Sequence, residues 1–317
     1  MKSKHIFIST IVKRLCVLLG GFTLCVSCSN NDELDKPTPT TSTPTTPTTP
    51  SEPEPISVNY ADINFSNWKV TLPVDENNNG KPDEYQPDEL VNFGYQTLAP
   101  VQPFMYDDTE DESLVFYTYP ESSTTNSSYS RTELRELINP LNSRENWTLL
   151  EGGTLKGRLK VTDVSENTNS SDTYHKVIVM QIHGIISEED MNTFNFSSNN
   201  GPPLIKIYWK DGYIWSHKKS LVDESTNGDD LLDTSSNTWY DIKQNLGYVG
   251  YEAFDFKIEA SDAKIVVTLN NESSHTYEDI SLEKWPFENY FKAGNYLTAT
   301  DANAYSYVKY YNLYITH

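Results

Sequence analysis

Cysteine is nearly absent from this chain of 317 residues. Its three cysteines, Cys16, Cys25 and Cys28, all lie within the first 28 positions. Disulfides and thiolate metal sites are therefore excluded from residues 29–317. Long apolar runs are missing too. The run at residues 15–26 has about a dozen residues, fewer than the ~20 that a membrane-spanning helix needs.

Positive charge is also scarce. The chain has 24 Lys and Arg against 45 Asp and Glu, which gives a formal net charge of -21. The first 28 residues hold four of the cations and none of the acids, so residues 29–317 carry 20 cations against 45 acids, or -25. Such a balance argues against nucleic acid and anionic membranes as partners.

The N-terminal segment resembles a bacterial lipoprotein signal. A basic stretch precedes the apolar run, Ser27 stands directly before Cys28, and two acids follow within residues 29–33. The resemblance implies that residues 1–27 are a signal peptide and that Cys28 is lipidated. It departs from the pattern at Cys25, where such signals prefer Leu. We therefore expect a lipoprotein of the outer membrane, exposed at the cell surface and attached only by its lipid. An ordinary secretory peptide cut near Ser27, giving a secreted protein, is the alternative.

Residues 28–56 are predicted to be the anchor cysteine followed by a Pro- and Thr-rich linker. Positions 34–56 are almost entirely Pro, Thr, Ser and Glu. This composition cannot bury a core and favours an extended chain. About 20 such residues at ~3 Å each would hold the rest of the protein ~60 Å from the anchor. Residues 57–317 remain as one folded domain.

Strand signals dominate this domain. Asp211–Gly212 and Ser261–Asp262 predict hairpin turns, and residues 282–285 predict one helical turn. Long helical periodicity is absent. We therefore predict an all-β fold of two packed antiparallel sheets, a sandwich or β-jelly roll with a concave groove. The clearest predicted strands are residues 157–164, 174–183, 204–210, 254–260 and 263–269.

Residues 131–136 place Arg131, Glu133 and Arg135 on one face of a predicted strand. A solvated face with surface ion pairs is the commoner meaning of such a run. Here, however, Leu134 and Leu137 give the strand a core side. The two guanidiniums can present planar forks to a carboxylate, and Glu133 can hold those forks in place.

A second segment carries Gln181 and His183 at the end of an apolar strand. A histidine in such a place is more often structural than catalytic. Beside an amide two positions away, it could instead lie in a groove over a sheet. Strict alternation predicts that Val177, Val179, Gln181 and His183 share one face, with Ile178, Met180 and Ile182 on the core face.

The third segment contains Tyr290, Lys292 and Tyr296. These side chains can be aimed together if the chain turns at Gly294–Asn295, a common turn dipeptide. The alternative is a loop whose tyrosines only pack.

Together, the three segments resemble those of the alginate lyases of polysaccharide lyase family 7. That family carries Arg-(Ser/Thr)-Glu-(Leu/Val)-Arg, Gln-(Ile/Val)-His and Tyr-Phe-Lys-Ala-Gly-x-Tyr-x-Gln, and all three segments occur here in that order. Residues 67–73 resemble its opening strand, so the likeness spans about residues 60–317. One position departs from the pattern. Thr298 stands where the family has Gln, and a hydroxyl reaches less far toward a sugar.

The resemblance implies that residues 57–317 are a catalytic domain that cleaves alginate by β-elimination at 1,4-linked uronates. Arg131 and Gln181 would neutralise the uronate carboxylate, helped by His183. His183, with a reference pKa of ~6.5, would be the base, and Tyr296, at ~10, the acid. If its arginine neighbours lower its pKa, Tyr296 could serve as base as well, as mannuronate would require. The expected substrate-binding residues are Glu133, Arg135, Tyr290 and Lys292.

In this family, Ile at position 182 goes with guluronate-containing substrates, so guluronate-containing blocks are the expected preference. The partner is then alginate or its oligomers, the protein is expected to be a monomer, and the elimination needs no cofactor. A chain at -25 should repel such a polyanion. The groove must therefore be a basic stripe in an acidic shell. Its candidates are Arg131, Arg135 and Lys292, followed by Lys176 and Arg158.

A possible calcium loop lies at residues 75–86. Asp75, Asn77, Asn79 and Gly80 match the first half of such a loop, but its twelfth position is Gln86 rather than Glu. We interpret it as a polar hairpin loop and expect no metal there.

Two other classes of protein remain open at this point. A jelly-roll glycoside hydrolase needs a close pair of carboxylates, and a non-catalytic carbohydrate-binding lipoprotein needs aromatic side chains and Arg. Absorbance near 235 nm from an unsaturated product separates a lyase from both. Internal or terminal cleavage depends on loops beside the groove, such as residues 166–173 and 188–203.

Overall fold

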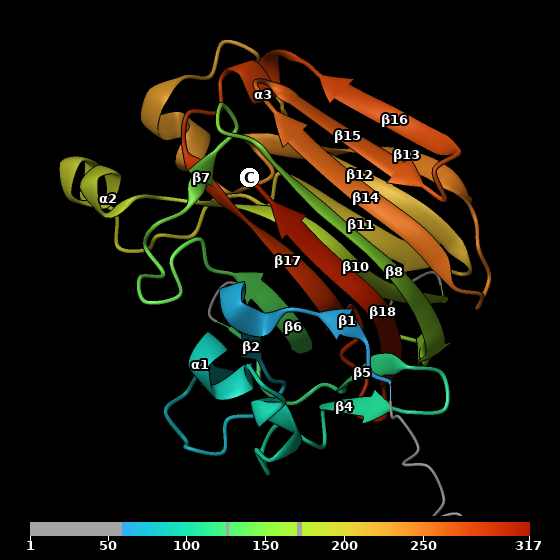
Figure 1. Ribbon diagram of the computed structural model, residues 1–317. Helices are drawn as coiled ribbons and strands as arrows, with labels where there is room; N and C mark the ends of the chain where they lie inside the picture. Colours follow the sequence, from blue (N-terminus) through green and yellow to red (C-terminus); the bar gives the residue numbers. More distant parts are fainter. Residues whose placement is uncertain (1–58, 125–126, 170–172) are drawn as a thin grey trace, which may run out of the picture. The chain divides into compact units, whose positions relative to one another are not determined.

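The computed structural model describes residues 59–124, 127–169 and 173–317, all within one compact unit that spans Ile56–His317. The predicted signal peptide, Cys28 and the linker lie outside the described residues and remain predictions. The strands form two sheets that pack face to face around a shared apolar core (Figure 1). The expected all-β sandwich of antiparallel sheets is thus confirmed.

Sheet A has the strand order β16-β15-β14-β8-β18-β5-β4, and β1 joins β18 in parallel. Its strands are β1 (Asp62–Ile63), β4 (Met105–Asp108), β5 (Ser113–Thr118), β8 (Gly153–Val164), β14 (Phe254–Ser261), β15 (Lys264–Leu269), β16 (Ser273–Glu278) and β18 (Ser306–Thr316).

Sheet B has the order β13-β12-β11-β10-β17-β6-β2-β3, with β7 paired to β17 and β9 to β10. Its strands are β2 (Trp68–Thr71), β3 (Glu84–Tyr85), β6 (Arg131–Glu136), β7 (Trp147–Thr148), β9 (Glu166–Asn167), β10 (Tyr174–Ile185), β11 (Ile205–Lys210), β12 (Tyr213–Leu221), β13 (Trp239–Tyr248) and β17 (Glu288–Leu297).

The helices are short. Within residues 59–124, 127–169 and 173–317, none is long and apolar enough to cross a membrane. They are α1 (Pro87–Leu90), α2 (Glu188–Phe194) and α3 (Ile280–Glu283), with 3₁₀ turns η1 (Phe65–Asn67), η2 (Gly94–Gln96) and η3 (Gly228–Leu232).

The two predicted hairpins form, one of them shifted by a residue. Asp211 and Gly212 both have positive φ, 50° and 84°, which is what a two-residue turn between paired strands requires. The second turn is Asp262–Ala263 rather than Ser261–Asp262. Ser261 is paired with Lys264, so the strand extends one residue further than the sequence suggested.

Strand β10 departs from strict alternation. Its register shifts between Ile178 and Met180 against both neighbouring strands. As a result Ile178 belongs to a small apolar cluster apart from the main core, whereas Val177 and Val179 lie in the main core. The prediction that these two valines share a face with Gln181 was therefore wrong, because a bulge changes which side chains share a face.

Strand β17 runs straight through the position where we expected a turn. Gly294 lies within the strand at φ 139°, and a Cβ there would lie 2.7 Å from the carbonyl oxygen of Thr132. Its N–H donates to the Tyr310 hydroxyl at 3.0 Å, and that hydroxyl donates to the Val179 carbonyl at 2.5 Å. Glycine thus permits close packing of β17 against β6. Tyr310 of sheet A holds β17 and β10 together through these two hydrogen bonds.

Candidate active site

The three sequence segments come together on adjacent strands of sheet B. β17 lies between β10 and β6. In the register of these strands, Lys292 stands opposite Gln181 on one side and opposite Arg135 on the other. Tyr296 is likewise paired with Arg131, and His183 with Tyr290. All eight predicted site residues of the folded domain are therefore within one three-strand patch.

A line of basic and polar side chains crosses seven strands at this level. We call it the cation row; its own members are cations, a histidine and an amide, and neighbouring acids pair with Lys69, Lys292 and His217. At ~4.8 Å between strands it extends over ~29 Å. It confirms the expected basic stripe in an acidic protein and adds members that the motifs did not reveal. In strand order its residues are Lys243, His217, Lys206, Gln181, Lys292, Arg135 and Lys69.

A second line, rich in aromatic rings, runs beside it. Trp215, Tyr208, Ile178 and Tyr296 follow one another across β12, β11, β10 and β17, and Arg131 ends the line on β6. Flat rings next to cations and amides suit a chain of acidic sugars, since a ring can pack on a sugar face while the cations bind its carboxylates.

A hollow of about 330 Å³ opens over this part of the sheet. Lys176 lines it, as expected, and so does Thr298, whose hydroxyl donates to the Lys176 carbonyl at 3.1 Å. Arg158 does not, because it lies on the exposed face of β8 in sheet A, so that candidate was wrong. The complete lining is Ser127, Ser128, Tyr129, Tyr174, Lys176, Ile178, Lys206, Tyr208, Tyr296 and Thr298.

Glu133 organises the centre of the patch. Its side chain is only 1% exposed. It accepts a hydrogen bond from the Gln181 amide at 2.6 Å, lies 3.5 Å from Arg131 Nη1, and forms an ion pair with Lys292. One buried carboxylate thus holds an amide, a guanidinium and an ammonium in fixed positions. Its burial leaves Glu133 little surface for a sugar.

Arg131 and Tyr296 form a stacked pair. The guanidinium carbon lies 4.0 Å from the centre of the ring. The Tyr296 hydroxyl makes a hydrogen bond with the hydroxyl of Ser127, a residue that sequence reasoning missed. No motif marks Ser127, because it lies in a Ser- and Thr-rich stretch ahead of the first segment.

His183 is oriented by two contacts. Its Nδ1 bonds with the Gly184 carbonyl at 2.9 Å, and its ring stacks on Tyr290 at 5.4 Å and 12°. A carbonyl only accepts, so Nδ1 carries the proton of the neutral ring and Nε2 keeps its lone pair. Arg135 of β6 is also held in place. It stacks on Tyr290 and donates hydrogen bonds to the Ser143 carbonyl and to Asn146 Oδ1, each at 3.0 Å.

The sequence and the fold both have known relatives. A family model described as alginate lyase matches residues 63–317. The chain belongs to this family. An alginate lyase from Klebsiella pneumoniae is 25% identical over 296 residues, which cover 80% of this chain and 89% of the relative.

Solved structures give the same answer. The crystal structure of alginate lyase A1-II', a member of polysaccharide lyase family 7, has 27% identity and a TM-score of 0.60, and the match covers 80% of this chain and 96% of that one. A substituted form of that enzyme in complex with the product GGG has 25% identity and a TM-score of 0.62, covering 81% and 97%. The resemblance read from the three motifs is thus confirmed.

The pKa values of Tyr296 and His183 shift in opposite directions, which distinguishes an acid from a base. Burial raises the pKa of Tyr296 more than Arg131 and the Ser127 hydrogen bond lower it, so the phenol holds its proton at neutral pH. The condition under which Tyr296 could also serve as the base is therefore not met, because burial outweighs the lowering of its pKa by Arg131. For His183, burial and then the Lys292 charge lower the pKa to about 3, so the imidazole is neutral.

The charge of Lys292 depends on its burial in the site. Burial lowers its pKa to about 8, against the opposing effect of Glu133 and with further lowering by Arg131. It is therefore a cation at neutral pH and loses that charge in mildly alkaline solution.

The suspected calcium loop is closed by its own backbone. Asp75 accepts hydrogen bonds from the N–H groups of Asn79 and Gly80 at 2.9 and 2.8 Å, and Asp83 accepts one from Glu76 at 3.0 Å. These bonds fit the interpretation of a polar loop. Within the described ranges, no three His, Cys, Asp or Glu side chains converge as metal ligands.

Proposed function

We propose that this protein depolymerises alginate by β-elimination and prefers blocks that contain guluronate. The observation that carries the proposal is the convergence of Arg131, Gln181, His183 and Tyr296 on three adjacent strands of a member of the alginate lyase family. Their arrangement supplies what the reaction requires, namely a carboxylate clamp, a neutral base and a protonated acid.

The clamp comes first, because the C5 proton of a uronate is barely acidic while the adjacent carboxylate is charged. Arg131 offers a planar fork and Gln181 an amide, and Glu133 fixes both. As the proton leaves, negative charge accumulates on the carboxylate oxygens, and preorganised donors stabilise that charge more than the ground state.

Proton transfer follows from the two pKa shifts. The Nε2 lone pair of His183 takes the proton from C5. The electron pair left on C5 forms the C4–C5 double bond, the bond between C4 and O4 breaks, and the Tyr296 hydroxyl donates its proton to O4. The products are a new reducing end and an unsaturated uronate at the new non-reducing end, and the two protein groups are reset by exchange with water.

The same shifts support the preference for guluronate. In guluronate, H5 and O4 lie on opposite sides of the ring, so a separate base and acid serve best. In mannuronate they lie on the same side, and one group would have to do both. A tyrosine with a raised pKa is a poor base. A relative of 25% identity has been crystallised with the substrate GGMG, which fits a guluronate-containing ligand.

We also propose cleavage at internal linkages. The cation row continues beyond Gln181 and Lys292 on both sides, through Lys206, His217 and Lys243 in one direction and through Arg135 and Lys69 in the other. A polyanion can therefore be held on both sides of the reacting linkage, which internal cleavage requires.

Absorbance near 235 nm tests the proposal on three substrates, polyguluronate, polymannuronate and mixed blocks, with product sizes followed over time. We expect the signal to grow fastest on polyguluronate or mixed blocks, with oligomers of several sizes appearing early. A rise in reducing ends without absorbance would contradict elimination. A faster rate on polymannuronate would contradict the preference, and monomer or dimer as the sole early product would contradict internal cleavage.

The surface-lipoprotein assignment is likewise a proposal, supported by the sequence around Cys28. Cys28→Ala should move the protein out of the membrane fraction without altering its rate. Retention of the variant in that fraction would contradict lipidation at Cys28.

A further inference from the structure

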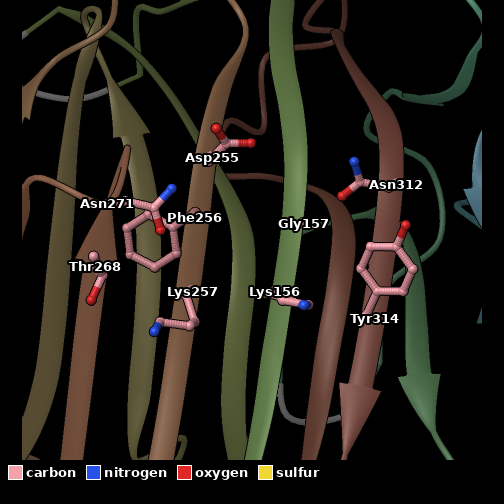
Figure 2. Close-up of a pocket in the computed structure, with 9 residues that line it drawn as sticks. All are labelled: Lys156, Gly157, Asp255, Phe256, Lys257, Thr268, Asn271, Asn312 and Tyr314. Carbon is pink, nitrogen blue, oxygen red and sulfur yellow. The ribbon is translucent and has the colours of Figure 1, made fainter.

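Sheet A has a hollow of its own on its outer face, about 260 Å³ in volume and lined from β15, β14, β8 and β18 (Figure 2). None of the residues that line it belongs to the three motifs or to the cation row. One line of facing residues crosses it: Thr268, Lys257, Lys156 and Tyr314 are paired in register across the four strands. Asn271 and Asn312 lie at its two sides.

The centre of the hollow is a pair of like charges. Lys156 and Lys257 stand directly opposite each other on neighbouring strands, an arrangement that costs stability in an antiparallel sheet. Their amines point away from each other in Figure 2. Lys257 pairs with Glu259 at 2.8 Å. Within the described part of the chain, Lys156 has no carboxylate within ion-pair distance. Because acids outnumber cations in this protein, a pair of opposed lysines with one acidic partner between them is not explained by stability.

An aromatic ring lies beside the unpaired lysine. The Lys156 amine is 5.2 Å from the centre of the Tyr314 ring. Tyr314 is 39% exposed, and its hydroxyl is bonded to Asp62 of β1, so the ring is held in place while part of it faces solvent. A fixed, exposed ring next to a cation is a surface on which a sugar can stack.

Amide and hydroxyl groups complete the lining. Asn312 Oδ1 accepts a hydrogen bond from the backbone N–H of Arg158 at 2.9 Å. This leaves the NH₂ group of Asn312 as a donor at the rim. Thr268 and Asn271 offer further polar groups on the opposite side. The one acid in the hollow, Asp255, is paired with Arg158 at 3.2 Å, so it does not cancel the lysines.

We propose that this hollow is a second, non-catalytic binding site for an acidic polysaccharide of the kind cleaved in the groove, an identification of the ligand that rests on the proposed function. Lys156 and Lys257 bind uronate carboxylates, Tyr314 packs on a sugar ring, and the amides bind hydroxyls. Because the site lies on the other sheet, it cannot position a reacting linkage. It holds the polymer near the protein and raises the effective concentration of linkages at the groove.

The test compares Lys156→Ala/Lys257→Ala with a control of equal charge change, Lys160→Ala/Lys264→Ala, on the same sheet but outside the lining. Each pair of substitutions is made in its own copy of the full chain. The first readout is retardation in native gels containing long-chain alginate, which requires no turnover. The second is KM and kcat from absorbance near 235 nm on long polymer and on a short oligosaccharide.

We expect the Lys156→Ala/Lys257→Ala chain to be retarded less and its KM on polymer to rise about threefold to tenfold, as expected for the loss of two exposed charge contacts. Its kcat and its kinetics on the oligosaccharide should match wild type, and the control should match wild type throughout. Equal retardation and equal KM in the two variants would overturn the site. So would a loss on the oligosaccharide as large as that on polymer, since the change would then lie in the groove.

The two proposals can fail separately. If the wild-type chain gives no absorbance near 235 nm but its retardation still depends on Lys156 and Lys257, the proposed function is contradicted and the second site stands. If the wild type is active and retardation is insensitive to these lysines, the lyase stands and the second site is contradicted.

Discussion

The guanidinium of Arg131 lies 4.0 Å above the ring of Tyr296. In the proposed mechanism, the group that clamps the substrate carboxylate and the group that protonates the leaving oxygen are thus in direct contact. Stacking fixes the plane of the guanidinium and the direction of the phenol at the same time. If the proposed roles are right, the stacking couples binding of the uronate to placement of the acid, and a change at either residue is expected to affect catalysis more than folding.

The first prediction concerns Arg131→Lys. An ammonium is a point charge and cannot replace a planar fork that stacks on Tyr296 and meets a carboxylate with two N–H groups. We expect kcat to fall by about 10²-fold or more, because the lost contact is strongest when charge has built up on the carboxylate. Initial rates at several substrate concentrations separate kcat from KM. Arg158→Lys, on the outer face of sheet A, is the control and should keep the wild-type kcat. A rise in KM with unchanged kcat would make Arg131 a binding residue only.

The second prediction is a pH profile. Burial lowers the pKa of Lys292 to about 8, so its charge is present below that pH and is lost above it. In the free protein, kcat/KM on alginate should decline as the pH rises through about 8. Lys292→Met removes the charge but keeps much of the volume, so KM at pH 7 should rise and this alkaline decline should become smaller. Burial also lowers the pKa of Lys176, in the same hollow, to about 8, so a smaller decline should remain. Lys264→Met on sheet A should keep the wild-type profile. An unchanged alkaline limb in Lys292→Met would assign that limb to another group.

The fold could be predicted from the sequence because strand alternation and turn residues are local signals. Alternation in the predicted strand at residues 157–164, part of β8, places Leu159 and Val161 in the core. The three motifs also predicted the centre of the site. Their residues lie on adjacent strands, which alternation alone could not have shown, since pairing of distant strands depends on the whole sheet.

What the sequence missed has a common cause. Lys206, His217 and Lys243 join the cation row only through the register of β11, β12 and β13, and no short pattern encodes that register. The bulge at Ile178 and the positive φ of Gly294 arise from packing against neighbouring strands. The raised pKa of Tyr296 could not be predicted, because the charge of Arg131 can be read from the sequence and the depth of burial cannot.

The third prediction concerns stability. Glu136 is completely buried and accepts hydrogen bonds from Trp147 Nε1 and the Phe291 N–H, each at 2.8 Å, and His317 Nε2 lies 2.6 Å from its other oxygen. Burial alone would lower the pKa of His317, but the hydrogen bond and charge of Glu136 raise it above its usual value. A raised folded-state pKa stabilises the protein fully below the unfolded value of ~6.5, and this contribution is lost as the pH rises through the folded value.

His317→Gln should therefore lower the free energy of unfolding by about 1–3 kcal/mol at pH 6 and by less at pH 9. Urea denaturation at the two pH values measures both differences. His275→Gln, at a histidine of β16 with no ion pair in the described part of the chain, should show no such pH dependence. An equal loss at pH 6 and pH 9 would mean that the protonated imidazole is not what Glu136 holds.

The most direct test of the central claim is Tyr296→Phe, measured for both binding and turnover. The ring and its stacking on Arg131 remain, and only the hydroxyl that carries the proton is removed. Affinity for a guluronate oligosaccharide should stay close to wild type, while the rate of absorbance gain near 235 nm should fall by about 10²–10⁴-fold. Tyr305→Phe, which removes a hydroxyl bonded to Asp163 on the other side of the sandwich, should leave both unchanged. A Tyr296→Phe protein that turns over at the wild-type rate would contradict the role of Tyr296 as the acid.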